Sequence, residues 1–176
     1  MLLFATDNNS NNVEIEQLQM RLQMGYEAAD EARSLMQDKQ YKQASSAFMD
    51  ALNLGRKPTL ALQEIDIENK DDNLQQEALQ WLINVCCESA QLNLNHLDNL
   101  DNARRDAWAA CNFSKYQKLE PLQCMQKLCQ QGNDLIGEFQ ACQQLLNLPF
   151  QEFESNDPER ERLSKRIEEL EKMLRS

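Results

Sequence analysis

Cysteine, histidine and carboxylate side chains are the groups in this sequence that could bind a metal ion or act in catalysis. The chain has six cysteines and one histidine, His96. Zinc is held by four ligands, mostly Cys and His, at short, paired spacings. The nearest approach to such a pair, Cys124 with Cys129, is too widely spaced, and His96 lies far from it in the sequence. We therefore expect no metal site, and cysteines that pack as small hydrophobic residues in a reducing compartment.

Catalysis and cofactor binding have no better support in the sequence. His96 has no neighbouring nucleophile for which it could act as a base. Paired carboxylates such as Asp71 and Asp72 are typical of a solvated charged surface, and four glycines are too few for a phosphate-binding loop. Trp81 and Trp108 are expected in the core. The prediction is a protein that is not an enzyme and holds no cofactor.

The composition excludes further classes of protein. The chain has 176 residues, 18 Lys and Arg against 29 Asp and Glu, a net charge of -11, four Gly and four Pro. So few turn residues, together with few Val, Ile and Thr, argue against β structure. The acidic total disfavours nucleic acid and anionic membrane as partners, and no apolar run is long enough to span a bilayer. Residues 1–4 are too short for a secretory signal, so a cytoplasmic protein is expected.

Seven helices and no sheet are predicted from apolar residues that recur at steps of three and four. The polar stretch over residues 1–12 is expected to be a disordered tail. Gly55 is the expected C-cap of the second helix, and residues 58–73 are expected to form an acidic insertion that carries a partial helix. Asp157 and Pro158 begin the last helix. The expected helices cover about 13–37, 41–55, 74–95, 101–118, 120–132, 135–148 and 157–176.

Three segments repeat a pattern of small and large residues over paired helices. The first copy reads Ala32, Leu35, Tyr41, Ala44, Phe48, Ala51 and Leu52. The second reads Leu97, Leu100, Ala103, Ala107, Ala110 and Cys111, and the third Gly132, Gly137, Ala141, Leu145 and Pro149. This pattern resembles the tetratricopeptide repeat (TPR) family, in which a small residue lets the partner helix approach. The resemblance covers roughly Tyr26 to Pro149.

The resemblance implies an all-α, right-handed superhelix of antiparallel helix pairs over residues 13–156, followed by a C-terminal helix over 157–176. The sequence departs from the family's pattern in two places. The gap between the first two copies exceeds the family's thirty-four-residue period by about 25 residues. The second copy also needs Ser89 or Ala90 to supply a small residue late in its first helix. An irregular all-α bundle is the alternative.

In this family the first helix of each pair lines a concave groove, which holds a peptide or a partner's helix. The resemblance therefore implies a non-enzymatic protein-interaction adaptor or scaffold. The acidic net charge favours basic or apolar partner segments. The groove residues that the three copies imply are Tyr26, Asp30, Arg33, Glu88, Leu92, Asn95, His96, Gln123 and Gln126.

The best-known members of the family hold the C-terminal carboxylate of a chaperone with a clamp of Lys, Asn and Arg residues on three first helices. Here Ala29 and Arg33 stand where Lys and Asn would be, and Leu119 and Gln123 stand where Lys and Arg would be. Two cations on separate helices, which such a carboxylate site requires, are missing. A chaperone tail is therefore not expected as the partner.

The last helix allows two interpretations. Leu163, Ile167, Leu170 and Leu174 follow the alternating steps of a heptad. They could cap the last repeat, or they could begin a short coiled coil. The second interpretation leads to an alternative function, a structural or assembly subunit that dimerises through its C-terminal helix.

Overall fold

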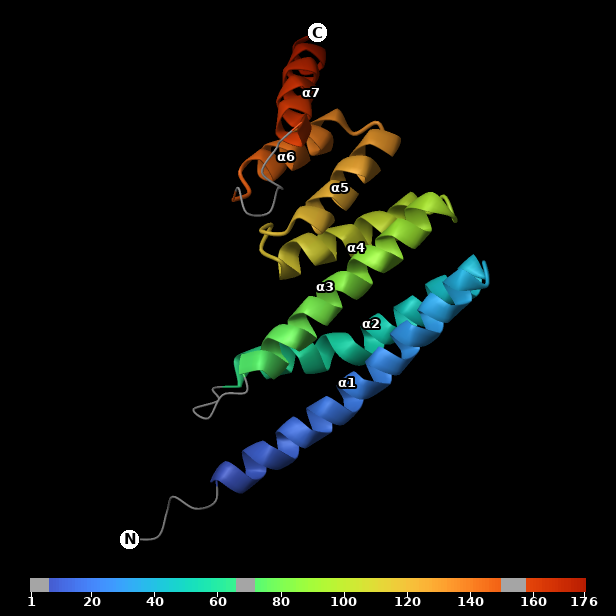
Figure 1. Cartoon of the computed structure of the whole chain (residues 1–176), viewed down its shortest axis with the longest axis vertical. Coiled ribbons are helices and arrows are strands. Elements are labelled where there is room, and N and C mark those ends of the chain that lie inside the picture. The colour runs from blue at the N-terminus through green and yellow to red at the C-terminus, as the bar shows by residue number, and fades with distance from the viewer. Residues whose placement is uncertain (1–6, 66–71, 150–157) are drawn as a thin grey trace. The chain divides into compact units, whose positions relative to one another are not determined.

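The computed structural model describes residues 7–65, 72–149 and 158–176, which are helical apart from short turns. Within these ranges there are seven helices and no strand (Figure 1), which confirms the all-α fold class. The helices are α1 (Asp7–Gln37), α2 (Tyr41–Glu64), α3 (Asp72–Asn95), α4 (Leu100–Phe113), α5 (Leu119–Gln131), α6 (Leu135–Leu146) and α7 (Pro158–Arg175). The chain divides into two compact units, Met1–Val85 and Cys86–Ser176, with the boundary inside α3.

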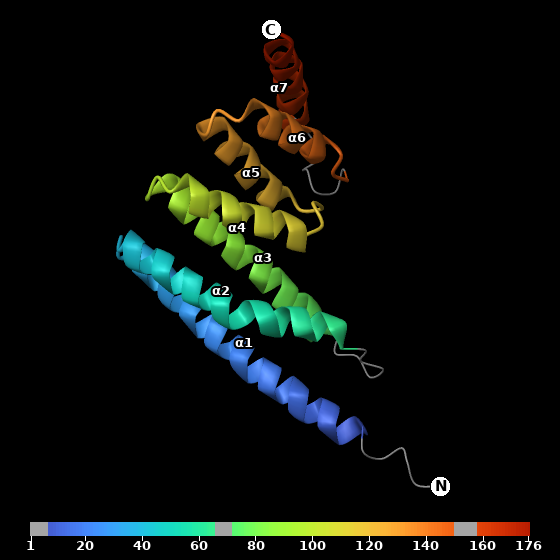
Figure 2. The same ribbon diagram turned by 180° about the vertical axis from the view of Figure 1, so that it is seen from behind.

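In the N-terminal unit, α1 and α2 form an antiparallel pair whose backbones come very close together (Figure 2). Both helices bury small residues, among them Gly25 and Ala29 of α1 and Ala51 and Gly55 of α2. A Cβ atom added to Gly25 would lie 3.2 Å from the Cα of Gly55 and 3.3 Å from the carbonyl oxygen of Ala51. Glycine at position 25 therefore lets the two helices approach this closely without displacing these backbone atoms.

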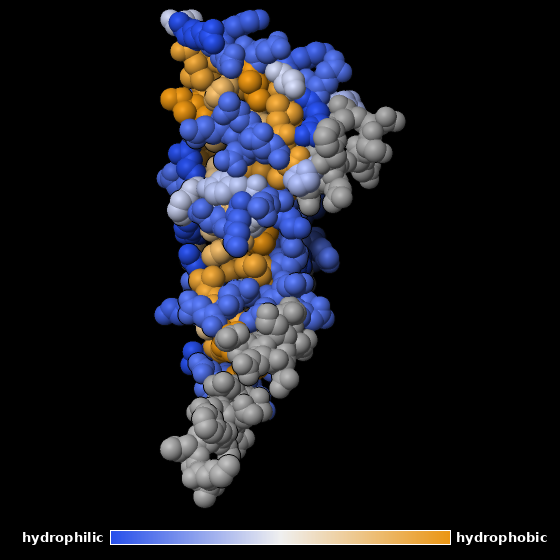
Figure 3. All heavy atoms as spheres, turned by 90° about the vertical axis from the view of Figure 1, so that its left-hand side faces the viewer, coloured by the Kyte–Doolittle hydropathy of each residue, from blue (hydrophilic) through white to orange (hydrophobic). Residues whose placement is uncertain are grey.

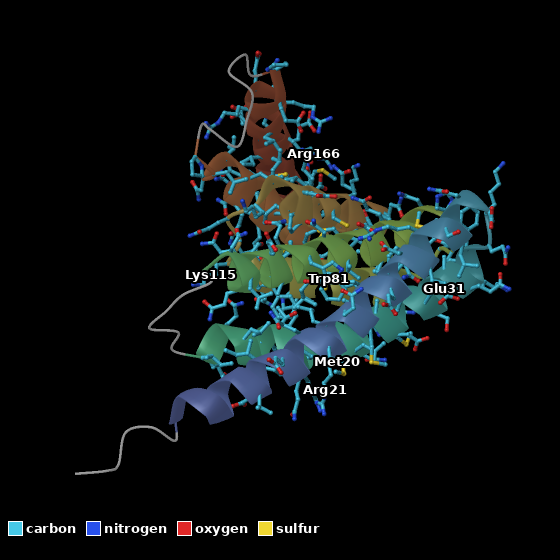
Figure 4. All side chains as sticks on the ribbon, turned by 60° about the horizontal axis from the view of Figure 1, so that its bottom comes forward. Met20, Arg21, Glu31, Trp81, Lys115 and Arg166 are labelled. Carbon is cyan, nitrogen blue, oxygen red and sulfur yellow. The ribbon has the colours of Figure 1, made fainter. Side chains whose placement is uncertain are left out.

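Trp81 of α3 covers the glycine crossing of the N-terminal unit (Figure 4). A Cβ atom added to Gly55 would lie 2.3 Å from two atoms of the Trp81 ring. The ring of Tyr26 meets that of Trp81 edge-on, with the ring centroids 4.8 Å apart. Leu22 of α1 and Leu62 of α2 lie in the same apolar cluster. The three helices of this unit therefore share one small core.

The prediction of Gly55 as a C-cap is wrong, because α2 continues through Gly55 and Pro58 to Glu64. Pro58 has no N–H to donate to the preceding turn, and α2 bends in its middle (Figure 2). The helix continues beyond the bend because its last turns bury Leu62 in the core. The first part of the expected acidic insertion is therefore helical, and residues 66–71 lie outside the described residues.

The N-terminal boundary also differs from the expectation. Helix α1 begins at Asp7, so residues 7–12 are helical rather than part of a disordered tail. Extending a helix that is already formed costs less free energy than starting one, which accounts for the additional turns. Residues 1–6, the rest of the expected tail, lie outside the described residues.

Three helices end in the same kind of turn, built on a left-handed residue other than glycine. Lys39, Lys115 and Asn133 have φ angles of 59°, 52° and 53°. The N–H of the following residue donates to a carbonyl five positions earlier, at 2.8 Å in each case: Gln40 to Leu35, Tyr116 to Cys111 and Asp134 to Cys129. These are Schellman-type caps. Gly132, expected at the end of α5, precedes the left-handed residue of its turn and has a φ of -80°.

The C-terminal unit packs its helices around two apolar clusters. The first joins the end of α3 to α4 and α5 through Ala90, Leu94, Ala103, Ala107, Cys124 and Leu128. The second joins α4, α5, α6 and α7 through Cys111, Leu122, Cys142, Leu145, Leu148, Leu163 and Leu170. Helix α7 therefore buries one side against its own unit as far as Leu170, whereas Leu174 near its end is 43% exposed. Hydrophobic side chains also reach the surface on one side of this unit (Figure 3).

The cysteines and the second tryptophan have different outcomes. All six cysteines are free and buried, as predicted. The prediction that Trp108 lies in the core is wrong, because its side chain is 58% exposed. Helix α4, which ends at Phe113 rather than near residue 118, presents Ala103 and Ala107 to α5. Trp108, the residue after Ala107, points about 100° away around the helix and so lies outside that contact.

Candidate functional site

A polar cleft between α5 and α7 is the candidate functional site of the C-terminal unit. It has a volume of about 460 Å³, within the range of ligand-binding pockets. Its lining residues are Gln123, Gln126, Lys127, Gln130, Glu159, Arg162, Leu163 and Arg166. The first four come from α5 and the last four from α7.

Helical spacing explains why these residues share the cleft. Leu122 and Leu128 of α5 are buried in the core clusters. The amide side chains at 123, 126 and 130 recur at steps of three and four, so they follow one side of the same helix. On α7, Leu163 is buried beneath the cleft, and the charged residues at 159, 162 and 166 keep the same steps. Each wall of the cleft is therefore a polar stripe of a helix whose apolar stripe lies in the core.

A buried ion pair attaches α7 to α6 at one end of the cleft. The Nε and Nη2 atoms of Arg166 donate to the two carboxylate oxygens of Glu138 at 2.7 and 2.9 Å. Nη1 of Arg166 donates to Glu169 at 2.9 Å. Gln130 of α5 donates a further hydrogen bond to Glu138 at 2.7 Å. Glu138 is 1% exposed, so three helices meet at one buried carboxylate.

The protonation state of this pair follows from its contacts. The hydrogen bonds from Arg166 hold the pKa of Glu138 below its ordinary value, and Gln130 acts in the same direction against the opposing effect of burial. Hydrogen bonds to Glu138 and Glu169 raise the pKa of Arg166. Glu138 is therefore a carboxylate at neutral pH, and its charge is balanced by Arg166.

The first turn of α7 is also attached to the end of α6. Arg160 donates from Nη2 to the carbonyl oxygens of Leu146 and Leu148, at 2.5 and 3.3 Å. These carbonyls lie at and just beyond the end of α6, where helices lack internal donors. Arg160 and Arg166 together hold both ends of the cleft's α7 wall against α6.

The amide and cationic side chains that line the cleft differ in exposure and in their present contacts. Gln126 is only 6% exposed and donates to the sulfur of Cys142 at 3.3 Å. Arg162 pairs with Glu159 at 2.6 Å, but 69% of its side chain is exposed. Lys127 is exposed and has no ion-pair partner within the part of the chain that the structure describes. Three cations and one carboxylate line the cleft itself.

The structure brings two of the predicted groove residues, Gln123 and Gln126, into this cleft. Four others were predicted on or just after α3. Glu88 is half-buried, Asn95 and His96 at the end of the helix are exposed, and Leu92 is fully buried. A partner cannot contact the Leu92 side chain, so its assignment to a groove is wrong.

The three groove residues predicted on α1 belong to the N-terminal unit. Tyr26 packs against Trp81. Asp30 accepts a hydrogen bond from Arg33 at 2.7 Å on the same helix.

Sequence reasoning missed the whole α7 wall of the cleft. The mixed charges of the last helix resemble an ordinary solvated surface, and nothing local in the sequence shows that Arg162 and Arg166 face α5. Glu138 gave a clearer signal. It shares one helix face with Ala141, Cys142 and Leu145. A carboxylate on an apolar face requires a buried partner.

Other kinds of site have less support in the structure. Over residues 7–65, 72–149 and 158–176, no three Cys, His, Asp or Glu side chains are placed to hold a metal ion. No helix in those ranges is both long and apolar enough to cross a bilayer. A second hollow of about 480 Å³ lies between the α4–α5 turn and the end of α6, and it includes none of the predicted groove residues.

Comparisons with protein-family models, with curated proteins and with solved structures found no match to this chain.

Proposed function

We propose that this chain is a non-enzymatic protein-interaction adaptor or scaffold of the TPR type, and that a partner segment binds in the cleft between α5 and α7. The observation that carries the proposal is the row of Gln123, Gln126 and Gln130 along one wall of that cleft. Each glutamine amide has both donor and acceptor atoms, as a peptide bond does. A row of such side chains suits the main chain of a bound peptide.

The helix turns support the repeat part of the proposal. Helices α1 and α2 are joined by a three-residue turn, and so are α5 and α6. Both turns close with a left-handed second residue, Lys39 or Asn133, and with equivalent 2.8 Å hydrogen bonds. Helix pairs with matching turns are expected of a repeat. In this proposal α7 is the terminal helix that covers the last pair.

Site-directed photocrosslinking tests the proposal. A benzoylphenylalanine placed at Gln123 should crosslink a partner protein in a cell extract, and at Gln140, an exposed residue of α6 outside the cleft, it should not. Excess unlabelled chain should compete with the crosslink. Equal crosslinking from both positions, or none from Gln123, would contradict binding in the cleft.

A structural subunit that dimerises through α7 is the second candidate. The observation that favours it is the exposure of Met173 and Leu174, which are 48% and 43% exposed at the end of the helix. If these residues form a dimer contact, replacing both with glutamate should halve the mass measured by light scattering. A monomeric mass for the wild-type chain would eliminate this candidate.

A further inference from the structure

We propose that the α5–α7 cleft selects the acidic side chain of an internal peptide segment, with Lys127 and Arg162 as the two cations that hold its carboxylate. This inference rests on the proposed function, since it assumes that the cleft binds a peptide, and it adds the chemistry of the ligand. It differs from the expectation set by the net charge, which favours basic or apolar partners. The local lining has the opposite sign from the chain as a whole.

The two cations come from facing walls of the cleft. Lys127 lies on α5 and Arg162 on α7. A carboxylate held between two such helices receives charge-assisted hydrogen bonds from both sides. Lys127 has no competing ion-pair partner within the described ranges. It is therefore ready to bind an anion without breaking a contact of its own.

Arg162 can exchange its present partner for a ligand at low cost. Its contact with Glu159 joins residues three apart on one helix, and the two side chains are 69% and 32% exposed. Exposed pairs of this kind contribute little to stability because water screens them and both side chains lose freedom. A ligand carboxylate between the two walls would contact both Arg162 and Lys127. In the structure Glu159 pairs with Arg162 and forms no ion pair with Lys127.

Arg166 also lines the cleft but has a different role. It is held by two hydrogen bonds to a buried carboxylate, which it would leave unbalanced if it turned toward a ligand. Arg166 is a positioning residue that keeps the α7 wall opposite α5. The proposed ligand contacts are therefore those of Lys127 and Arg162.

The glutamines indicate an internal segment rather than a chain terminus. The amide nitrogens of Gln126 and Gln130 donate inward, to Cys142 and Glu138. Gln130 is exposed and its amide oxygen receives no hydrogen bond from the described part of the chain, so this oxygen can accept from an N–H group of a peptide. The row from Gln123 to Gln130 extends over about 10 Å, the length of about three extended residues. The peptide main chain on both sides of the acidic residue can therefore lie along this row.

Peptide selection on the full chain tests the inference. Two phage libraries of random twelve-residue segments would be compared, one displayed internally and the other with a free C-terminus. We expect the internal library to enrich Asp or Glu at one position. The K127A/R162A double variant should lose that enrichment. The K165A variant, which removes an exposed α7 cation outside the cleft, should keep it.

Affinity measurements on one selected peptide with blocked ends complete the test. K127A and R162A should each weaken binding about tenfold, the loss expected for one charge-assisted hydrogen bond. A peptide with Gln in place of the acidic residue should bind both variants and the wild type equally weakly. Circular dichroism of each variant would verify that the overall helix content is unchanged.

The outcomes separate the inference from the proposed function. Selected peptides without an acidic position, selection only from the free-terminus library, or an acidic preference that survives in K127A/R162A would each overturn the inference. In those cases a peptide-binding cleft would still stand. If the wild-type chain enriches no peptide from either library, the proposed function fails and the inference fails with it.

Discussion

Replacing Arg166 with methionine removes the side chain that balances the buried Glu138. Arg166 supplies two of the three hydrogen bonds that Glu138 receives, at 2.7 and 2.9 Å, and Gln130 supplies the third. Breaking a buried ion pair from one side costs about 3–5 kcal/mol. Because 32% of the Arg166 side chain is exposed and water can enter its place, we expect R166M to lower the free energy of unfolding by about 3 kcal/mol.

Substituting the other partner, Glu138, should cost less stability, because the two partners differ in exposure. Glu138 is 1% exposed, whereas Arg166 can turn toward Glu169 and solvent. We expect E138Q to lower the free energy of unfolding by about 1–2 kcal/mol, the usual loss for a hydrogen bond to a charged group. The double variant should be more stable than R166M alone, because an uncharged amide costs less to bury than an unpaired carboxylate.

The pH dependence supplies an independent check on the same pair. Arg166 lowers the pKa of Glu138 in the folded chain below its unfolded value, which is about 4.3 in peptides. The stabilisation is therefore present above that value and is lost as the pH falls through the folded pKa. In R166M the buried carboxylate is unbalanced, so protonation relieves its cost. The difference between wild type and R166M should shrink below about pH 5.

Urea unfolding monitored by circular dichroism, with hydrogen exchange on α6 and α7, measures these effects. The predicted order of stability is wild type, then E138Q, then the double variant, with R166M the least stable. Faster exchange should be confined to the C-terminal unit, since both residues belong to it. An R166M variant as stable as wild type, or an R166M loss that does not change between pH 7 and 4, would refute the reasoning.

Three further predictions concern the packing of the fold. Gly55→Ala gains about 1 kcal/mol of helix propensity but places a Cβ 2.3 Å from the Trp81 ring, so we expect a net loss of about 1–2 kcal/mol in the free energy of unfolding measured in urea. The control Gly132→Ala should change this free energy by less than about 0.5 kcal/mol. Burial raises the pKa of the Cys124 and Cys142 thiols to about 11, and all six cysteines are buried. Iodoacetamide at pH 8 should therefore label the folded chain slowly and all six cysteines quickly in urea, whereas rapid labelling of the folded chain would contradict the buried core. Because these thiol pKa values are raised on folding, their contribution is fully present below the unfolded value and is lost above about pH 9, so stability measured by urea titration should decline from pH 9 to 11.

The helices of this chain were largely predictable because their signals are local. Apolar steps of three and four mark each helix. Within the described ranges, side-chain caps mark the starts of α4 and α6, where Asn99 accepts from the N–H of Asn102 at 3.2 Å and Asp134 from the N–H of Gly137 at 2.9 Å. Prediction failed where tertiary packing outweighed a local rule. Gly55 and Pro58 are usual helix terminators, but the contact of Gly55 with Trp81 and the burial of Leu62 keep α2 continuous across both.

Only part of one wall of the candidate site was predicted from the sequence, and the difference between the two walls has a physical reason. Gln123 and Gln126 lie on a regular helix, and the position of its polar stripe follows from that of its apolar stripe. The opposite wall depends on where α7 docks, which is decided by the burial of Leu163 and Leu170 and by the Glu138 carboxylate. No spacing within α7 encodes that position.

The most direct test of peptide binding in the α5–α7 cleft is an NMR titration of the full chain with a selected acidic peptide. We predict that the side-chain amide signals of Gln123, Gln126 and Gln130 shift and saturate together with the backbone signal of Arg162. Signals of Tyr26 and Asp30 in the N-terminal unit should stay unchanged. Shifts that saturate only in the N-terminal unit, with the three glutamines unaffected, would contradict the central claim.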